Sequence, residues 1–76
     1  MASKVIEYVR HARQRMKWRK ISEEEVRLTL DNPDKLILLE ENKHHAYKVM
    51  NTRNIRVTYR LLKDSFVVLT VVDKSD

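Results

Sequence analysis

Very short connections divide the second half of the chain into strand-like runs, and this spacing limits the fold more than any other feature. After Pro33 come the runs "DKLILLEEN", "HAYKVMN", "IRVTYRLL" and "FVVLTVV", which are rich in the β-branched and aromatic residues that favour strands. The connections between them are "NKH", "TRN" and "KDS". Connections this short join neighbouring antiparallel strands, because a parallel crossover needs many more residues. The sequence therefore predicts an antiparallel meander.

Side chains in "IRVTYRLL" alternate between two faces of the predicted sheet. One face holds Ile55, Val57, Tyr59 and Leu61, and the other holds Arg56, Thr58 and Arg60. We expect the apolar face to pack against helices and the basic face to meet solvent. The last run is apolar on both faces, which is typical of a central or partly covered strand.

Two helices are predicted ahead of the meander. The first extends from about His11 to Arg19; the preceding "KVIEYVR" fits a short strand better than the helical stripe that it also allows. The second begins after Ser22, which forms a capping box with Glu25, and it ends at Asn32-Pro33. Residues 1–76 are thus expected to form a single α+β domain, with two N-terminal helices on one face of a three- to four-stranded antiparallel sheet.

Missing residue types exclude several functions. The chain has no glycine, so it lacks the phosphate-binding loops that need glycine's backbone freedom. It has no cysteine, which excludes disulfides and thiolate metal sites. No apolar run approaches the roughly 20 residues of a membrane helix, and the N-terminus lacks the apolar segment of a secretion signal. We expect a cytoplasmic protein with no metal and no cofactor.

Charge is distributed in three zones along the chain. Residues 1–20 contain seven Lys or Arg and one Glu, residues 21–41 contain two basic and seven acidic residues, and residues 42–76 contain seven basic and three acidic residues. The net charge is +5. Two basic blocks around an acidic one indicate an anionic partner, which would meet particular faces of the fold.

The first basic block, "HARQRMKWRK", contains a candidate active site. His11, Arg15, Trp18 and Arg19 lie along one broad side of the predicted helix, and Ala12 and Met16 take the buried side. The neighbouring arginine favours a neutral imidazole at His11, which can act as a general base. The arginines can bind a phosphate and Trp18 can stack on a base. An ordinary solvated basic face is the alternative, and for Trp18 taken alone core packing is the better prediction.

The second basic feature is on the predicted open face of the sheet. Arg56 and Arg60 share that face, with Lys48 and Thr70 placed beside them by one choice of register, and this makes a plausible phosphate platform. Such charges are equally common as solubility devices on strands. The adjacent pair His44-His45 is predicted to lie in a surface turn, because neighbouring side chains point in opposite directions and cannot readily share one metal.

The pattern "HARQRM..R.IS", a helix ending at "NP", then "IRVTYR" and "VVLTVV" resembles a small family of domains of unknown function grouped with the RelE/ParE-like toxin superfamily. The resemblance implies a toxin-like α+β fold. It also implies either cleavage of messenger RNA, often on the ribosome, or inhibition of DNA gyrase, with silencing by an antitoxin. The family motif corresponds to His11, Arg15, Arg19, Tyr59 and Thr70. Lys20 stands where that family commonly has a glycine that ends the helix in a left-handed turn.

The leading hypothesis is a toxin-like, metal-independent endoribonuclease that acts on mRNA and has an acidic antitoxin as its protein partner. The proposed catalytic residues are His11, Arg15 and Arg19. The proposed nucleic-acid-binding residues are Arg13, Lys17, Lys48, Arg56, Arg60 and Thr70. The alternatives are a non-catalytic RNA- or ribosome-binding protein and a protein-interaction module with the same basic surface.

Overall fold

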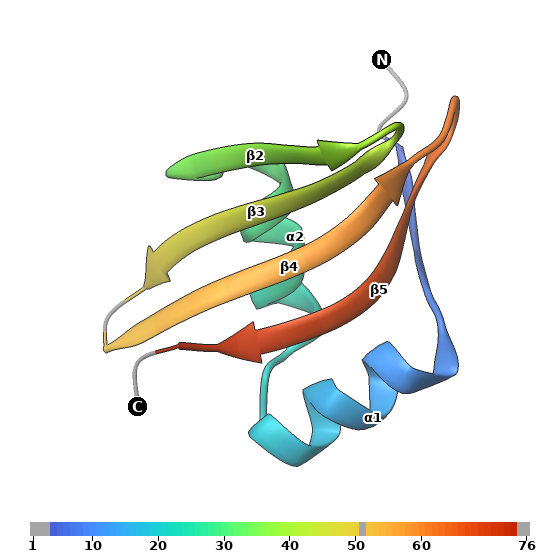
Figure 1. Ribbon diagram of the computed structural model, residues 1–76. Coiled ribbons are helices and arrows are strands. Elements are labelled where there is room, and N and C mark those ends of the chain that lie inside the picture. The colour runs from blue at the N-terminus through green and yellow to red at the C-terminus, as the bar shows by residue number, and fades with distance from the viewer. Residues whose placement is uncertain (1–3, 51, 75–76) are drawn as a thin grey trace.

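The protein is an α+β fold in which two helices cover one face of a sheet (Figure 1). The computed structural model describes residues 4–50 and 52–74. The elements in chain order are β1 (Val5–Tyr8), α1 (Arg10–Arg19), α2 (Glu23–Asp31), β2 (Lys35–Glu40), β3 (Lys43–Met50), β4 (Arg53–Leu61) and β5 (Ser65–Asp73). The two predicted helices and the predicted strand before them are confirmed. Neither described helix is both long and apolar enough to cross a membrane.

The sheet is mixed and has five strands in the order β1-β5-β4-β3-β2. Strands β2 to β5 form the predicted antiparallel meander, but β1 pairs with β5 in parallel. The prediction of a three- to four-stranded antiparallel sheet was therefore wrong. Short connections fix the direction only of the strands that they join. No short connection joins β1 to β5, because both helices and three strands separate them along the chain.

The ends of both helices follow from local residues. At the N-terminus of α2, Ser22 Oγ accepts from the Glu25 backbone N–H at 3.1 Å, and Glu25 Oε1 accepts from the Ser22 backbone N–H at 2.8 Å. The predicted capping box is therefore confirmed. After α1, Lys20 takes the left-handed conformation with φ 56° and ψ 43°. A lysine thus occupies a backbone conformation that glycine adopts at lower cost.

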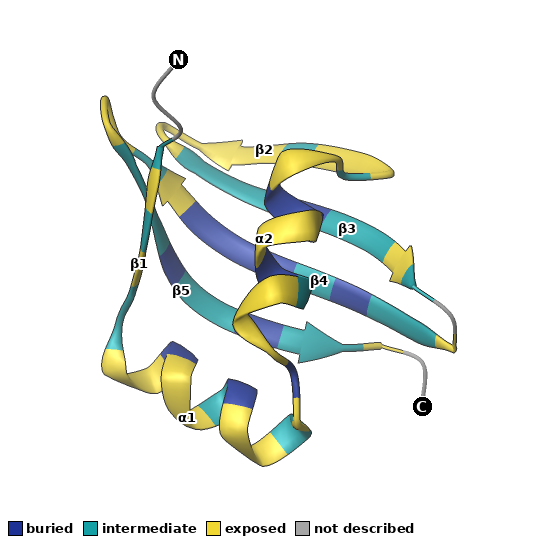
Figure 2. Cartoon of the chain, turned by 180° about the vertical axis from the view of Figure 1, so that it is seen from behind, coloured by how far each residue is buried: buried dark blue, intermediate teal, exposed yellow. Residues whose placement is uncertain are grey.

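The core lies between the helices and the sheet (Figure 2). Its buried apolar members include Ala12 and Met16 from α1, Val26 and Leu30 from α2, Ile55, Val57 and Tyr59 from β4, and Val68 and Val71 from β5. The predicted apolar face of β4 is confirmed, with Leu61 half-buried beside it. A β-bulge shifts the register between Thr58 and Tyr59, so that Val68 and Val71 are both fully buried although they are three positions apart. As predicted, β5 is an interior strand.

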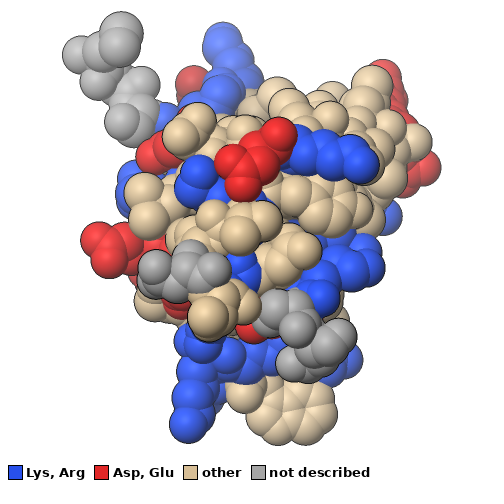
Figure 3. Space-filling model, turned by 90° about the vertical axis from the view of Figure 1, so that its left-hand side faces the viewer, with Lys and Arg blue, Asp and Glu red and all other residues tan. Residues whose placement is uncertain are grey.

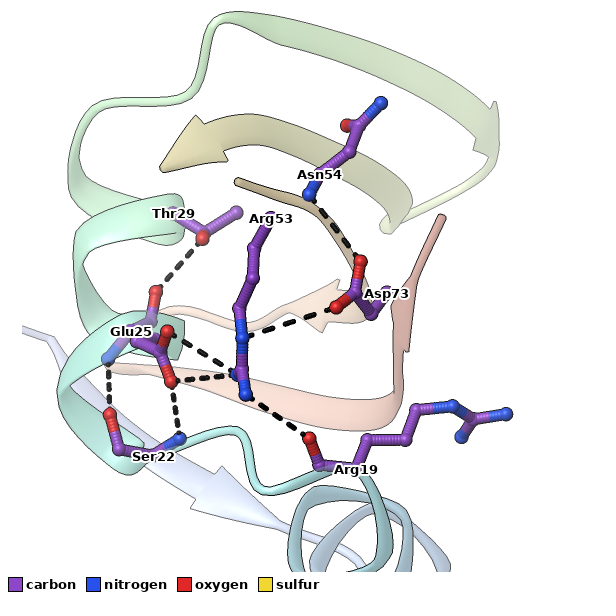
Figure 4. A network of polar contacts seen from close by, with 7 residues as sticks. All are labelled: Arg19, Ser22, Glu25, Thr29, Arg53, Asn54 and Asp73. Carbon is purple, nitrogen blue, oxygen red and sulfur yellow. Dashed lines mark hydrogen bonds and ion pairs between the residues drawn. The ribbon is translucent and has the colours of Figure 1, made fainter. Parts of the chain in front are cut away.

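A half-buried polar network connects the ends of four elements (Figure 4). Arg53, the first residue of β4, donates from Nη1 to Glu25 Oε1 at 3.2 Å and from Nη2 to the Arg19 carbonyl oxygen at 3.4 Å. Its Nε lies 4.0 Å from a carboxylate oxygen of Asp73, at the end of β5. One guanidinium therefore ties the end of α1 and the first turn of α2 to the start of β4 and the end of β5.

Candidate nucleic-acid interface

An open groove of about 560 Å³ lies on the exposed side of α1. It is lined by His11, Gln14, Arg15, Lys17 and Trp18, which we call the α1 groove. Trp18 is 75% exposed, so the prediction that it packs in the core was wrong. Ala12 and Met16 define the buried side of α1, and a residue two positions after Met16 points away from that side.

Three side chains of the α1 groove are connected by contacts with Arg15. Arg15 Nε–H donates to Nε2 of His11 at 3.3 Å, and the Arg15 guanidinium carbon lies 5.3 Å from the centroid of the Trp18 ring. In this contact Nε2 of His11 is the hydrogen-bond acceptor and the Arg15 guanidinium is the donor. The groove thus combines a proton acceptor, a fixed cation and a bare aromatic face.

Two other cations of α1 are directed out of the groove. Arg13 lies on the opposite flank, where Nη1 reaches Glu23 Oε2 at 3.0 Å and the guanidinium carbon lies 4.7 Å from the centroid of the Tyr8 ring. Arg19 Nη1 donates to the carbonyl oxygen of Val71 in β5 at 3.5 Å. The structure therefore brings His11 and Arg15 together but directs Arg19, the third predicted catalytic residue, toward β5.

The face of the sheet opposite the helices, here called the open face, contains most of the second predicted site. Three rows cross β3, β4 and β5: Tyr47–Arg56–Val72, His45–Thr58–Thr70 and Lys43–Arg60–Val67. Arg56, Arg60 and Thr70 thus share one face, as predicted.

Lys48 does not belong to the open face, and its placement there was wrong. It lies opposite Ile55 and therefore points to the helix side of the sheet. Its Nζ donates to the Asn32 carbonyl oxygen at 2.9 Å and lies 3.7 Å from Asp34 Oδ1. These contacts hold the end of α2 against β3, which is a structural role.

Sequence reasoning missed His45 and Tyr47 as members of the open face. Both histidines lie in strand β3, after the tight connection at residues 41–42, so the prediction of a surface turn was wrong. Their opposite orientation is confirmed, because His44 stacks on Tyr59 with ring centroids 5.3 Å apart, whereas His45 Nδ1 lies 3.4 Å from the Tyr47 hydroxyl oxygen. The alternation of a strand places His45 and Tyr47 on the same face, but only the register of β3 against β4 sets them beside Arg56.

The electrostatics of the open face are dominated by cations. Burial lowers the pKa of the His45 imidazole below its usual value, and the nearby cations Arg56, Lys43 and Lys74 lower that pKa further. The buried Nε of Arg56 has no hydrogen-bond acceptor among the described residues. Arg60 is partly neutralised, because its Nη2 lies 3.8 Å from Glu40 Oε1. Of the two arginines on this face, Arg56 is therefore the one without a carboxylate contact among the described residues.

Basic side chains gather at the end of the molecule formed by α1 (Figure 3). The α1 groove lies on the flank of α1 opposite the one that meets α2, and Arg19 joins α1 to β5. Among the described residues, His11 and Arg56 are not in contact, so the groove and the open face are separate clusters. Among the described residues, no three His, Asp or Glu side chains are grouped as metal ligands.

Comparison with curated proteins and with solved structures found no match. A family model described as "Domain of unknown function (DUF4258)" matches residues 8–73. This range includes both helices, strands β2 to β5 and every side chain of the α1 groove. The chain therefore belongs to the family described as a domain of unknown function (DUF4258).

Proposed function

We propose that the protein is a toxin-like RNA-binding protein that holds single-stranded RNA in the α1 groove and cleaves it without a metal. The observation that carries this proposal is the contact of Arg15 with both His11 and the exposed ring of Trp18. An exposed aromatic face stacks on an unpaired base, and an adjacent guanidinium binds a phosphate through paired hydrogen bonds. Duplexes hide their base faces, so the groove favours single strands.

Each step of the cleavage has a group in the groove. His11 accepts the proton of a ribose 2′-hydroxyl, and the resulting oxygen attacks the adjacent phosphorus. The bond from phosphorus to the 5′-oxygen breaks, which leaves a 2′,3′-cyclic phosphate on one strand. Arg15 stabilises the negative charge that develops on the phosphoryl oxygens. The leaving 5′-oxygen takes a proton from Lys17, which lines the same groove.

Two further features support an RNA target. The open face adds the cations Lys43, Arg56 and Arg60, which can follow a phosphate backbone without reading its sequence. The sequence also resembles a small family of domains of unknown function that is grouped with the RelE/ParE-like toxins, and the ribonuclease members of that superfamily act on messenger RNA and are silenced by an antitoxin. We therefore propose mRNA, engaged on the ribosome, as the substrate, and an acidic antitoxin as the protein partner.

Non-catalytic RNA binding is the second candidate function, and one contact of His11 supports it. His11 is exposed, and its Nε2 already accepts a hydrogen bond from Arg15. A general base must release this bond before it can take a proton, whereas stacking on Trp18 and phosphate binding require no such change. Binding without cleavage is the outcome that this second candidate predicts.

The two candidates are separated by measuring binding and cleavage on the same RNA. Binding is followed by fluorescence anisotropy at several salt concentrations, and cleavage is mapped by primer extension on mRNA that is either naked or undergoing cell-free translation. Trp18→Ala should weaken RNA binding by roughly ten- to a hundredfold, because base stacking contributes about 1–3 kcal/mol per base. The His11→Ala variant should still bind RNA but should no longer cleave it.

Leu28→Ala is the matched control, because it removes an exposed apolar side chain from α2, away from the groove. It should leave both readouts unchanged. RNA affinity that is equal in Trp18→Ala and the unmodified protein would refute the α1 groove as the binding site. Binding without cuts in either setting would leave the second candidate as the function.

A further inference from the structure

Strand β2 leaves an unusual amount of apolar surface exposed at the edge of the sheet. It is the terminal strand, with β3 as its neighbour in the sheet. Its sequence is KLILLE, and Leu36, Leu38 and Leu39 are 53%, 65% and 45% exposed. An edge strand with this composition offers both backbone hydrogen-bonding groups and apolar side chains to another strand. The opposite edge differs, since β1 has four residues and Arg19 covers the next part of β5.

The two faces of β2 are fixed by its pairing with β3. Leu36 lies opposite Ala46 and Leu38 opposite His44, so both leucines are on the helix side of the sheet. Ile37 lies opposite His45 and is on the open face. The register shift between Leu38 and Glu40 places Glu40 opposite Lys43, on the open face, where Lys35 also lies. The two ends of β2 thus carry opposite charges on the same face.

We propose that β2 pairs with the β2 strand of a second copy of this chain, antiparallel and about a two-fold axis through Ile37. Strands that pair across such an axis must bring together residues of the same face. In this register Ile37 meets Ile37 of the second copy, and Leu36 meets Leu38 of the second copy. The bulge at Leu39 then brings Lys35 opposite Glu40 of the second copy, twice per dimer. Apolar and charged positions are both self-complementary.

These charges favour a second copy of this chain as the strand that pairs with β2, because each charged end of β2 meets the opposite charge on the other copy. A one-residue slip would place side chains of opposite faces in the same pair, which a continuous sheet does not allow. In the proposed register the dimer is a ten-stranded sheet whose two open faces point to the same side, because the two-fold axis is perpendicular to the sheet. The inference rests on β2 alone and holds whether or not the α1 groove binds RNA.

Cysteine cross-linking tests the register directly, because the chain contains no cysteine. In the proposed dimer the two Ile37 positions face each other at a Cα separation of about 4.5–5.5 Å, which is within disulfide range. Ile37→Cys should therefore form a covalent dimer under mild oxidation. Val49→Cys is the matched control, since Val49 is 62% exposed and lies on β3, one strand inside the β2 edge. The control should remain a monomer on a non-reducing gel.

Solution mass tests the association without a cross-link. Sedimentation of the full chain should give a concentration-dependent mass that approaches twice 9.2 kDa. Leu38→Lys should abolish the dimer, and Val49→Lys should not. Lys35→Glu and Glu40→Lys should each weaken dimerisation by about tenfold. The Lys35–Glu40 pair occurs twice in the dimer, and a cross-strand pair contributes about 0.2–1 kcal/mol. The double variant Lys35→Glu/Glu40→Lys should recover part of the affinity, since it recreates both opposite-charge pairs across the interface, whereas Glu40→Lys also removes the contact with Arg60 within each copy.

Three results would overturn the proposal. The first is a mass of 9.2 kDa at every concentration at which the protein stays dispersed. The second is equal cross-linking of Ile37→Cys and Val49→Cys. The third is a dimer whose affinity does not change with Leu38→Lys or with either single charge reversal. Circular dichroism of each variant shows whether the monomer is folded, so loss of the dimer is distinguished from loss of the fold.

Discussion

Replacement of Arg53 by methionine should destabilise the protein far more than removal of an ordinary surface arginine. Arg53 connects Glu25, Asp73 and the carbonyl oxygen of Arg19. The side chains of Arg53, Glu25 and Asp73 are 28%, 27% and 20% exposed, so water competes only in part for these contacts. Methionine retains much of the apolar stem and removes the charge and all the donors.

The expected loss is about 2 kcal/mol of unfolding free energy. A hydrogen bond to a charged group contributes about 1.5–3 kcal/mol when it is sheltered, whereas an exposed ion pair contributes about 0–1 kcal/mol. The contacts of Arg53 are intermediate in burial. The acids left behind keep other partners, because Glu25 accepts from the Ser22 backbone N–H and Asp73 accepts from the Asn54 backbone N–H. Their remaining cost is therefore moderate.

Urea denaturation followed by circular dichroism measures this loss, and the melting temperature should fall by about 8–16 °C for a domain of this size. Arg60→Met is the matched control, because it makes the same chemical change in the same strand. The Arg60–Glu40 pair is 44% and 62% exposed, so its loss should cost less than about 1 kcal/mol. Equal destabilisation by the two substitutions would refute the argument that partial burial makes the Arg53 network strong.

Two further predictions concern the backbone and the pH dependence of stability. Lys20→Gly should raise the unfolding free energy by about 0.5–1 kcal/mol in the same assay, because glycine relieves the left-handed conformation at φ 56° but also frees the unfolded chain. A loss of stability would show that Lys20 is unstrained there. The lowered pKa of His45 means that the unfolded chain binds its proton first, so stability should decrease as pH falls below the unfolded value of 6.5. His45→Gln should flatten the decrease that begins below pH 6.5, above the range in which most carboxylates titrate. An unchanged slope would contradict the assignment.

Most of the fold could be predicted because its signals are local. Ser22 and Glu25 specify a helix start by themselves, and the alternation in β4 identifies its buried face without reference to other strands. The pairing of β1 with β5 could not be predicted in this way. It joins segments near opposite ends of the chain, and only packing around the two helices decides whether they run parallel.

The open face was predicted only in part, because its composition depends on register. Alternation shows that Tyr47 and Lys48 point to opposite sides, but it does not say which of the two shares a face with Arg56. The pairing of Tyr47 with Arg56 decides this point. The same pairing adds His45 and removes Lys48, so a change of one residue in register would exchange Tyr47 for Lys48 and His45 for His44 in the candidate site.

Neighbouring elements, and not the basic sequence itself, decide which cations of α1 can meet RNA. Arg13 and Arg15 are two positions apart in the same helix, yet their partners differ. Arg13 contacts Glu23 and Tyr8. Among the described residues, the side-chain contacts of Arg15 are with His11 and Trp18 of the α1 groove. An arginine engaged by a carboxylate must give up that contact before it can bind a phosphate, and Arg15 has no such contact to break among the described residues. Arg15→Ala should therefore weaken RNA binding more than Arg13→Ala, although both remove one positive charge. A purely electrostatic surface would give equal losses, since it would count charges without regard to their partners.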